Sequence, residues 1–437
     1  MPSSPLRMYS WNPRCYITKD IHVYRSALIA FQNIVPISLF ISIELVKTIQ
    51  AYFINQDIDM YYKPLDTSCV PKTWNISDDL GQIEYIFSDK TGTLTQNVME
   101  FQKCSINGVA YGDGITEAMR GAVARQGLRQ SMTSEEQDEH IRRLKGQMLR
   151  IMEESFQNRY LQREKLTLIS THLAEEMVDP NSGQRSHILA FFRALAICHT
   201  VLAEKPEPHE QPFYITYKAE SPDEAALVGA ARDVGIPFVR KSSGGIDIEV
   251  LGQSERYVPL RVLEFNSTRK RMSVIVRNPE GRLVLYCKGA DSVIYARLAA
   301  DHDPDLKECT AHDLETFANA GLRTLCVAYR YLEEAEYEDW VRRYDAAASA
   351  VQDREEEIEN VSEMIEQNLY ILGATALEDK LQEGVPEAIQ MLHDAGIKLW
   401  ILTGDKVQTA IEIGTYFRLC ILHIRSANTR ILPRLQL

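Results

Sequence analysis

Two polar loops, one beginning at residue 89 and the other at residue 403, constrain this chain more than any other feature. The first loop begins at Asp89 after the apolar residues 83–87, and the second begins at Thr403 after residues 397–402. Short apolar segments beside helical patterns are typical of buried strands in a parallel sheet, where ligands bind beyond the carboxyl ends of the strands. We therefore expect the two loops to face one shared site.

The residue types in the first loop suit phosphoryl transfer. A carboxylate such as that of Asp89 can attack phosphorus and hold the phosphoryl group as an aspartyl phosphate. This attack by an anion requires neutralisation by Mg²⁺ and by hydroxyl and amide donors, which Thr91, Gly92 and Thr93 can supply. The alternative is a plain polar turn, but the string DKTGTLT at 89–95 is too specific to arise readily by accident.

The residues between the loops predict an α+β domain beside the parallel sheet. Apolar residues on one face of 385–392, followed by Gly396, predict a helix between strands at 370–374 and 397–402. The charged segment 133–164 predicts an amphipathic helix with a solvated face. Further helices are expected at 188–199, 223–233, 313–320 and 337–354, and strands at 261–264, 272–276 and 283–287.

Composition narrows the class of protein. With 437 residues the chain is long enough for two or three domains, and its net charge of -13 argues against a nucleic-acid-binding protein. The eight cysteines include no CxxC pair and no zinc-type pairing with histidine. This pattern indicates reduced thiols in a cytosolic setting and no zinc site.

Residues 26–54 are the one candidate membrane span. They are long enough to cross a bilayer, which takes about 20 residues, yet they include Gln32, Asn33, Pro36, Glu44 and Lys47. A buried core helix with a kink is the alternative, and composition alone leaves it open. Basic residues before the segment would place residues 1–25 in the cytoplasm by the positive-inside rule.

The two loops resemble a known family. DKTGTLT at 89–95 is similar to the phosphorylation signature of P-type ATPases, and ILTGDK at 401–406 resembles their second conserved loop. The resemblance implies an incomplete haloacid-dehalogenase-like phosphorylation domain built on a doubly wound parallel sheet, with an inserted nucleotide-binding domain and one transmembrane helix. It also implies that ATP phosphorylates Asp89 and that Mg²⁺ is bound by the Asp89 carboxylate and the Thr91 carbonyl. The residues that it places around the phosphates are Lys90, Thr91, Thr403, Gly404 and Asp405.

Four segments in the middle of the chain resemble the nucleotide-domain motifs of lipid flippases: 221–227, 264–273, 288–291 and 321–324. An aromatic ring such as Phe265 offers a face to adenine, Lys288 can reach the base or the phosphates, and Arg323 can pair with phosphate. A phenylalanine among strand residues is by itself more often part of a core. The ATP contacts that the resemblance implies are Glu224, Phe265, Ser267, Lys288 and Arg323.

The candidate span resembles the fourth transmembrane helix of lipid flippases. It has no carboxylate near Pro36, and this proline leaves the carbonyl of Gln32 without its helical donor. Asn33, Pro36 and Ser38 are therefore the candidate contacts of a phospholipid headgroup, whereas a helix–helix hydrogen bond is the alternative for Asn33. The family orientation puts residues 1–25 outside and Asp89 in the cytoplasm, against the charge count. Residues 74–101 look most like the fungal branch of these pumps.

The resemblance covers roughly residues 26–414 and predicts a partial pump that is inactive alone. The segment at 112–116 is expected to be a turn, and the basic residues after 414 do not resemble the family. The expected parts are a loop at 1–25, a transmembrane helix at 26–54, the phosphorylation domain at 55–115 and 369–414, an insertion and linker at 116–185, the nucleotide-binding domain at 186–368 and a divergent tail at 415–437.

The complete pump is expected to be an integral protein of the plasma membrane or of Golgi or endosomal membranes, with cytoplasmic catalytic domains and an accessory β-subunit of two spans. Two other functions remain open at this point. One is a catalytically dead, ATP-binding regulatory chain. The other is a soluble phosphatase with an aspartate nucleophile, which would lack both the nucleotide domain and the span.

Overall fold

The computed structural model describes residues 13–31, 37–73, 76–114, 116, 134–207, 209–350 and 352–402. The chain divides into two compact units, Met1–Glu84 and Tyr85–Leu437. The first unit contains helices α1 (Pro13–Phe31) and α2 (Ile37–Asn55), a 3-10 turn at Lys63–Leu65 and the short helix α3 (Ser77–Leu80). Each unit has its own internal contacts.

Helix α2 is long and apolar enough to cross a membrane. Ala51 is its single buried residue, so α2 is not a core helix of the described residues. Of the predicted span at 26–54, Ile37–Asn55 has the length and composition of a membrane helix, and its crossing of a membrane stays a prediction. Its first residues instead belong to α1, and residues 32–36 lie outside the described residues.

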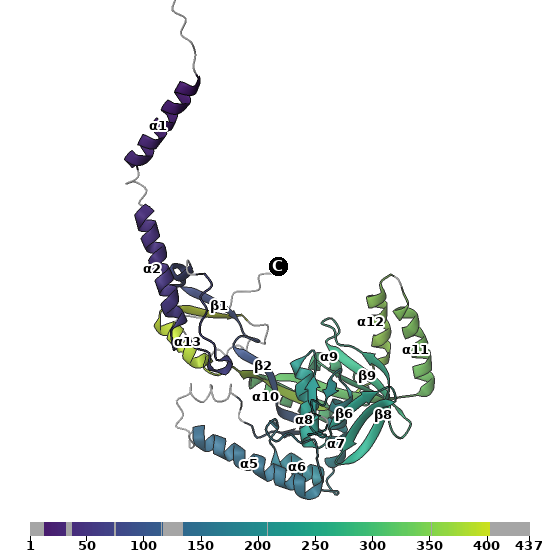
Figure 1. The fold of residues 1–437 in the computed structure, drawn as a ribbon. Coiled ribbons are helices and arrows are strands. Elements are labelled where there is room, and N and C mark those ends of the chain that lie inside the picture. The colour runs from purple at the N-terminus through teal and green to yellow at the C-terminus, as the bar shows by residue number, and fades with distance from the viewer. Residues whose placement is uncertain are drawn as a thin grey trace, which may run out of the picture. The chain divides into compact units, whose positions relative to one another are not determined.

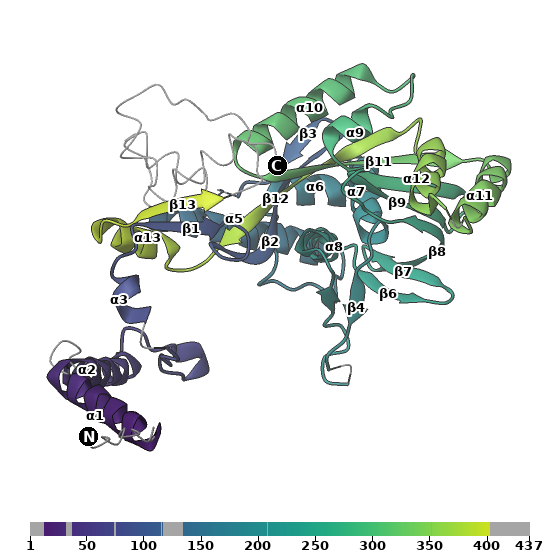
Figure 2. The same cartoon turned by 90° about the horizontal axis from the view of Figure 1, so that it is seen from above.

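The second unit is built on a nine-stranded sheet in which every neighbouring pair of strands is antiparallel (Figures 1 and 2). A separate small ladder pairs β4 (Leu202–Glu204) with β5 (Thr216–Lys218). In spatial order, the strands of the large sheet are β3 (Val109–Tyr111), β2 (Thr95–Ile106), β12 (Tyr370–Leu381), β11 (Arg323–Leu332), β10 (Leu283–Gly289), β9 (Arg271–Arg277), β8 (Gln253–Leu263), β7 (Gly245–Val250) and β6 (Phe238–Ser242).

Both faces of this sheet are covered by helices. Successive side chains of a strand point to opposite faces, and the strands have apolar side chains on both of them. In β9, Val274 and Val276 belong to one core while Ile275 between them belongs to another. The first core also takes side chains from α5 (Ser134–Ser155), α6 (Thr171–Val178), α7 (Arg185–Ile197) and α8 (Pro222–Val234). The second takes side chains from α9 (Asp291–Tyr295), α11 (Glu334–Ala348) and α12 (Arg354–Ile365).

A second, smaller assembly carries the parallel pair of strands that the two loops predicted. Strand β1 (Tyr85–Asp89) pairs in parallel with β13 (Lys398–Leu402), and α13 (Val385–Asp394) precedes β13. A small core of Leu94, Ile389 and neighbouring aliphatic side chains packs between them. Of the predicted doubly wound sheet, the described residues contain these two strands.

Several local predictions differ from the structure. The helix expected at 337–354 ends at Ala348, and the helix expected at 313–320 begins at Pro304. The strand expected at 370–374 is longer and belongs to the antiparallel sheet as β12, because it pairs with β2 and β11 on its two sides. The helix expected at 133–164 ends at Ser155. Beyond it, Asn158 donates to the carbonyl oxygen of Arg232 at 2.7 Å and Tyr160 is buried, so tertiary contacts override the helical pattern.

The boundary between the nucleotide-binding part and the phosphorylation part, expected near residue 368, stays a prediction. The helix α10 (Pro304–Asn319) packs on β12, with Phe317 beside Ala376. The long strands β2 and β12 extend from this packing toward the parallel pair (Figure 2). They provide both covalent connections between the two assemblies.

Gly373 lies where β12 and β2 approach most closely. A Cβ atom at this position would lie 2.2 Å from the carbonyl oxygen of Ser105 and 3.0 Å from the ring of Phe191. We expect Gly373→Ala to lower the free energy of unfolding by about 1–3 kcal/mol, the cost of overpacking a core. Urea denaturation followed by circular dichroism measures this change.

The matched control is Gly229→Ala in helix α8, where a Cβ atom would meet nothing within 4 Å. Because alanine favours a helix over glycine, this variant should be neutral or more stable by up to about 1 kcal/mol. Equal stabilities for the two variants would contradict the close approach of β12 to β2 at Gly373.

Candidate functional site

The ends of β1 and β13 bring the two predicted loops to one edge of the parallel pair. Asp89 is the last residue of β1 and stands opposite Leu402, the last residue of β13. The amide of Lys90 donates to the carbonyl oxygen of Leu402 at 3.2 Å, which continues the pairing by one residue. Thr403, Gly404 and Asp405 follow Leu402 directly in sequence but lie outside the described residues.

The turn after Asp89 is closed by its own backbone. The amide of Lys90 donates to Oδ1 of Asp89 at 2.8 Å, and the amide of Leu94 donates to the carbonyl of Lys90 at 3.0 Å. Gly92 has a φ of 78°, a left-handed conformation that favours glycine, and its amide donates to Oγ1 of Thr95. The carboxylate of Asp89 is thus oriented by a backbone donor while remaining exposed to solvent.

The turn that follows this carboxylate has both exposed and buried residues. Thr91 and Thr93 are exposed, whereas Lys90, Leu94 and Thr95 are buried. Carboxylate and carbonyl oxygens are the ligands that Mg²⁺ prefers, and it commonly keeps water and phosphate oxygens in its other positions. Asp89 and the backbone of Thr91 therefore fit the predicted partial set of Mg²⁺ ligands.

A second group of predicted residues gathers at the start of α8. Lys288, on β10, donates from Nζ to Oε1 of Glu224 at 2.6 Å, and its side chain is 7% exposed. Oε2 of Glu224 accepts from both the amide and the hydroxyl of Thr200, at 3.1 and 2.7 Å. Burial opposes ionisation of Glu224, but Lys288 and Thr200 outweigh it and lower the pKa of this carboxyl. The Glu224 carboxyl is therefore ionised, in contact with a lysine side chain that is largely shielded from solvent.

Arg323 lies near the same helix end, between two carboxylates. Its guanidinium is 3.5 Å from Oδ1 of Asp223 and 3.9 Å from Oδ2 of Asp379. Burial raises the pKa of Asp223, the charge of Arg323 opposes this rise, and Asp379 adds to it. Because Asp223 and Glu224 are adjacent, the first turn of α8 brings Arg323 and Lys288 into one group.

Phe265 and Ser267 lie in the loop between β8 and β9 and face solvent; the Phe265 side chain is 63% exposed. This contradicts the alternative that Phe265 is a core residue. The loop ends at Lys270, whose carbonyl accepts from the amide of Ala290, two residues after Lys288. The structure therefore brings the loop and the end of β10 together.

Among the predicted lipid contacts, Asn33 and Pro36 lie outside the described residues. Ser38 is exposed on α2, with its carbonyl bonded to Ser42.

Sequence reasoning missed Thr200 and His199. Nδ1 of His199 accepts from the amide of Val201 at 3.1 Å and Nε2 donates to the carbonyl of Ala196 at 2.9 Å, so the ring shapes the turn that presents Thr200 to Glu224. Burial, reinforced by the charge of Lys288, lowers the pKa of His199 to about 3. No local pattern connects Thr200 with Glu224, and the contact between them is created by the packing of α7 against α8.

Comparison with known proteins shows which family this sequence is similar to. Residues 187–384 match the family model of the P-type ATPase cytoplasmic domain N. Over 390 residues, 89% of this chain, the sequence is 53% identical to a phospholipid-transporting ATPase of Chaetomium thermophilum and to one of Schizosaccharomyces pombe. Human phospholipid-transporting ATPase IC is 42% identical over 392 residues. The chain belongs to the P-type ATPases.

The recognition of phospholipid-transporting P-type ATPases from the motifs is thereby confirmed. This P-type ATPase chain spans about a quarter of the length of its relatives: 25% of the Chaetomium protein and 28% of the Schizosaccharomyces and human proteins. The matched segment contains Asp89. It also contains the residues gathered at the start of α8 and the Phe265 loop, which together are called the nucleotide group here. The similarity therefore covers both parts of the candidate site.

The buried His199 predicts a pH dependence of stability. The unfolded chain binds a proton at this histidine below about pH 6.5, whereas the folded protein binds one only near pH 3. Unfolding therefore takes up a proton between these values, and stability falls as the pH drops from about 6.5. In His199→Gln, which keeps one donor and one acceptor, we expect the slope to decrease by up to about 1.4 kcal/mol per pH unit.

Urea denaturation at pH 5, 6 and 7 measures this slope. His187→Gln is the matched control, because His187 is exposed on α7, the helix that ends just before His199. A His199→Gln variant that keeps the slope of the unaltered protein would contradict the assignment of a buried, neutral His199.

Proposed function

We propose that this chain handles ATP for a phospholipid-transporting P-type ATPase that works through an aspartyl phosphate at Asp89. The observation that carries the proposal is the exposed Asp89 carboxylate at the end of β1, opposite the strand end that leads into Thr403. The relatives that cover most of the chain are phospholipid-transporting ATPases. Together these observations support one function for the two loops.

In the proposed step, an oxygen of the Asp89 carboxylate attacks the γ-phosphorus of ATP. The bond from the γ-phosphorus to its bridging oxygen breaks, ADP leaves with the electron pair, and an acyl phosphate remains on Asp89. The amide of Lys90 holds the carboxylate at 2.8 Å, and Thr91 and Thr93 offer donors to the transferred group. Mg²⁺, held by Asp89 and the Thr91 carbonyl, would neutralise phosphate charge.

The nucleotide group has a role that matches its charges. Lys288 and Arg323 are the cations that would face the nucleotide, and each is held by a carboxylate of α8. A cationic side chain that is already fixed by an ion pair loses little conformational entropy when a ligand binds. This preorganisation favours binding. The exposed ring of Phe265 offers the face on which adenine would stack.

The membrane part of the proposal rests on α2 and on the relatives. In the proposed pump, α2 crosses the membrane, phospholipid is the substrate, and Asp89 faces the cytoplasm, where ATP is present. An accessory β-subunit of two spans and a plasma-membrane, Golgi or endosomal location complete the proposal. A protease added outside sealed cells should cleave the chain only at residues that precede α2. Cleavage at residues that follow α2 would contradict this orientation.

The test of the phosphoryl step is Asp89→Asn. The variant should form no acid-stable phosphoenzyme from γ-labelled ATP, because the amide cannot act as the nucleophile, while nucleotide binding stays within about twofold. The assay uses a chimera in which this chain replaces the matching segment of the 53% identical Schizosaccharomyces pombe relative. Label that survives in the Asn variant would assign the acceptor to another carboxylate.

The test of the nucleotide group is a pair of substitutions with different stability costs. Phe265→Ala should weaken ATP binding without Mg²⁺ by about 1–2 kcal/mol, with little effect on stability because the ring is exposed. Lys288→Ala should weaken binding similarly and also lower stability, because it leaves the Glu224 charge unpaired in a nearly dry site.

Calorimetry and thermal denaturation of the chain in detergent measure the two effects. Tyr331→Ala is the control, since Tyr331 is an exposed aromatic residue at the opposite end of β11 from Arg323. ATP affinities that are unchanged in both variants would remove this site assignment.

A further inference from the structure

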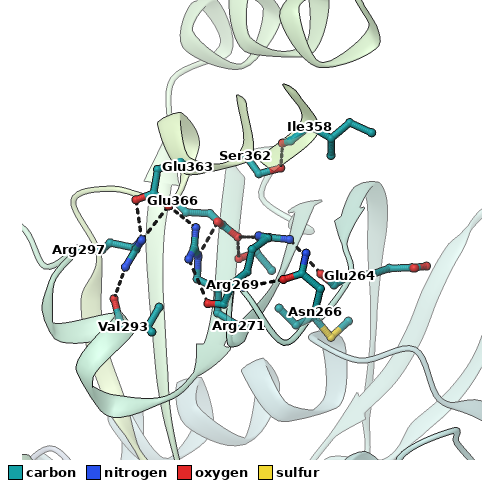
Figure 3. A network of polar contacts seen from close by, with 12 residues as sticks. Glu264, Asn266, Arg269, Arg271, Val293, Arg297, Ile358, Ser362, Glu363 and Glu366 are labelled. Carbon is teal, nitrogen blue, oxygen red and sulfur yellow. Dashed lines mark hydrogen bonds and ion pairs between the residues drawn. The ribbon is translucent and has the colours of Figure 1, made fainter. Parts of the chain in front are cut away.

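A buried ion network lies directly behind the loop that carries Phe265 (Figure 3). Its centre is Glu366, the C-cap residue directly after α12, whose side chain is 0% exposed. The carboxylate accepts from Nη2 of Arg269, from Nε of Arg271 at 2.7 Å and from the hydroxyl of Ser273. Three donors therefore converge on one carboxylate that solvent does not reach.

Arg269 links this buried centre to the loop itself. Its Nη1 donates to the carbonyl of Glu264 at 2.9 Å, and its amide donates to Oδ1 of Asn266 at 2.6 Å. The amide of Lys270 donates to the carbonyl of Asn266, and Lys270 has a φ of 52°. The Arg269 guanidinium thus connects Glu264, the first residue of the loop, to Glu366 at the end of α12. The hydrogen bond from Lys270 to Asn266 closes the loop backbone beside it.

The outward side of the same loop carries the residues that would meet a nucleotide. Phe265 and Ser267 are exposed, whereas Arg269 between the loop and the sheet is buried, with a side chain that is 5% exposed. Because 63% of the Phe265 side chain is exposed, its own packing is limited. The bonds that Arg269 and Lys270 make on the inward side therefore contribute to the position of its backbone.

The network also reaches the strand that carries Lys288. Arg271 stands opposite Gly289 in the β9–β10 ladder, and a Cβ atom at Gly289 would lie 2.6 Å from Cβ of Arg271 and 2.7 Å from the carbonyl of Lys270. The end of β10 is therefore packed closely against the end of the loop, and the amide of Ala290 donates to the carbonyl of Lys270. The arginines therefore connect both halves of the candidate adenine site to α12.

We propose that Glu366 is a positioning residue for nucleotide binding, which acts through Arg269 to hold the Phe265 loop in its binding conformation. The inference rests on the proposed nucleotide site and adds to it a group that is too deeply buried to touch the ligand. A preorganised loop does not have to be ordered when the ligand binds, and this saving appears as affinity. Helix α12 is, on this proposal, the support of the base-binding surface.

The test is a double-mutant cycle on the full chain in detergent, with ATP in the absence of Mg²⁺ as the probe. Glu366→Gln should weaken ATP binding about tenfold, since the loop then has to be ordered on binding. In the Phe265→Ala background the same substitution should change affinity by less than about twofold, because its effect passes through Phe265. Effects that simply add would overturn the proposal, as would an unchanged affinity for Glu366→Gln.

Glu363→Gln is the matched control. Glu363 lies in the same network and binds Arg271 and Arg297, but it makes no bond to Arg269, and its side chain is 40% exposed. This variant should keep its ATP affinity within about twofold, because the loop anchor is intact. A loss as large as that of Glu366→Gln would show a general requirement for the network and would overturn the specific role of Glu366.

Two further measurements keep the test decisive. Arg269→Lys retains the charge but cannot bridge Glu264 and Glu366, so it should reproduce the loss of affinity if Glu366→Gln does not fold. Hydrogen exchange at the amides of Arg269 and Lys270 should become faster in these variants and not in Glu363→Gln. If the unaltered chain binds no ATP, the proposed function fails, and unchanged exchange would separately overturn the anchoring role.

Discussion

The antiparallel pairing of β2 with β12 is the constraint on which the rest of the second unit depends. The two strands are twelve residues long, and at one end Thr95 stands opposite Leu381. Strand β2 follows the turn after Asp89, and β12 precedes α13 and β13. The nine-stranded sheet is consequently joined to the candidate phosphoryl-transfer site at Asp89 by one pair of strands. The close contact at Gly373 and the bond from Gln96 to the carbonyl of Leu381 hold this pair together.

The charged groups of the second unit show how a buried polar network can organise a surface site. Glu224 and Glu366 each accept hydrogen bonds from donors on other parts of the chain. Isolated buried charges are costly, whereas removing one partner of a buried pair leaves the other uncompensated. The geometry of the candidate nucleotide site is thus coupled to stability, which favours a single arrangement of Lys288, Arg323 and the Phe265 loop.

Much of the site was predictable because its residues sit in continuous motifs. Asp89 with its following turn, the strand at 283–287 and the helix at 223–233 are all defined by neighbours within a few positions. The helix predicted at 133–164 was too long, because Asn158 and Tyr160 make tertiary contacts that no helical period reveals. The hairpin β6–β7 was also missed, since its turn residues and short strands resemble an irregular loop.

By itself, the sequence determined the family, several of the elements around the candidate site, and the residues that carry charge, aromatic surface and the candidate nucleophile. Only the tertiary structure decided which residues meet: Thr200 with Glu224, Glu366 with Arg269, and β12 with β2 rather than with β13. The physical reason is that periodicity and motif chemistry act over a few residues. A strand's partner and the donors around a buried carboxylate depend instead on contacts between distant segments, whose closure is favourable only when the whole core packs.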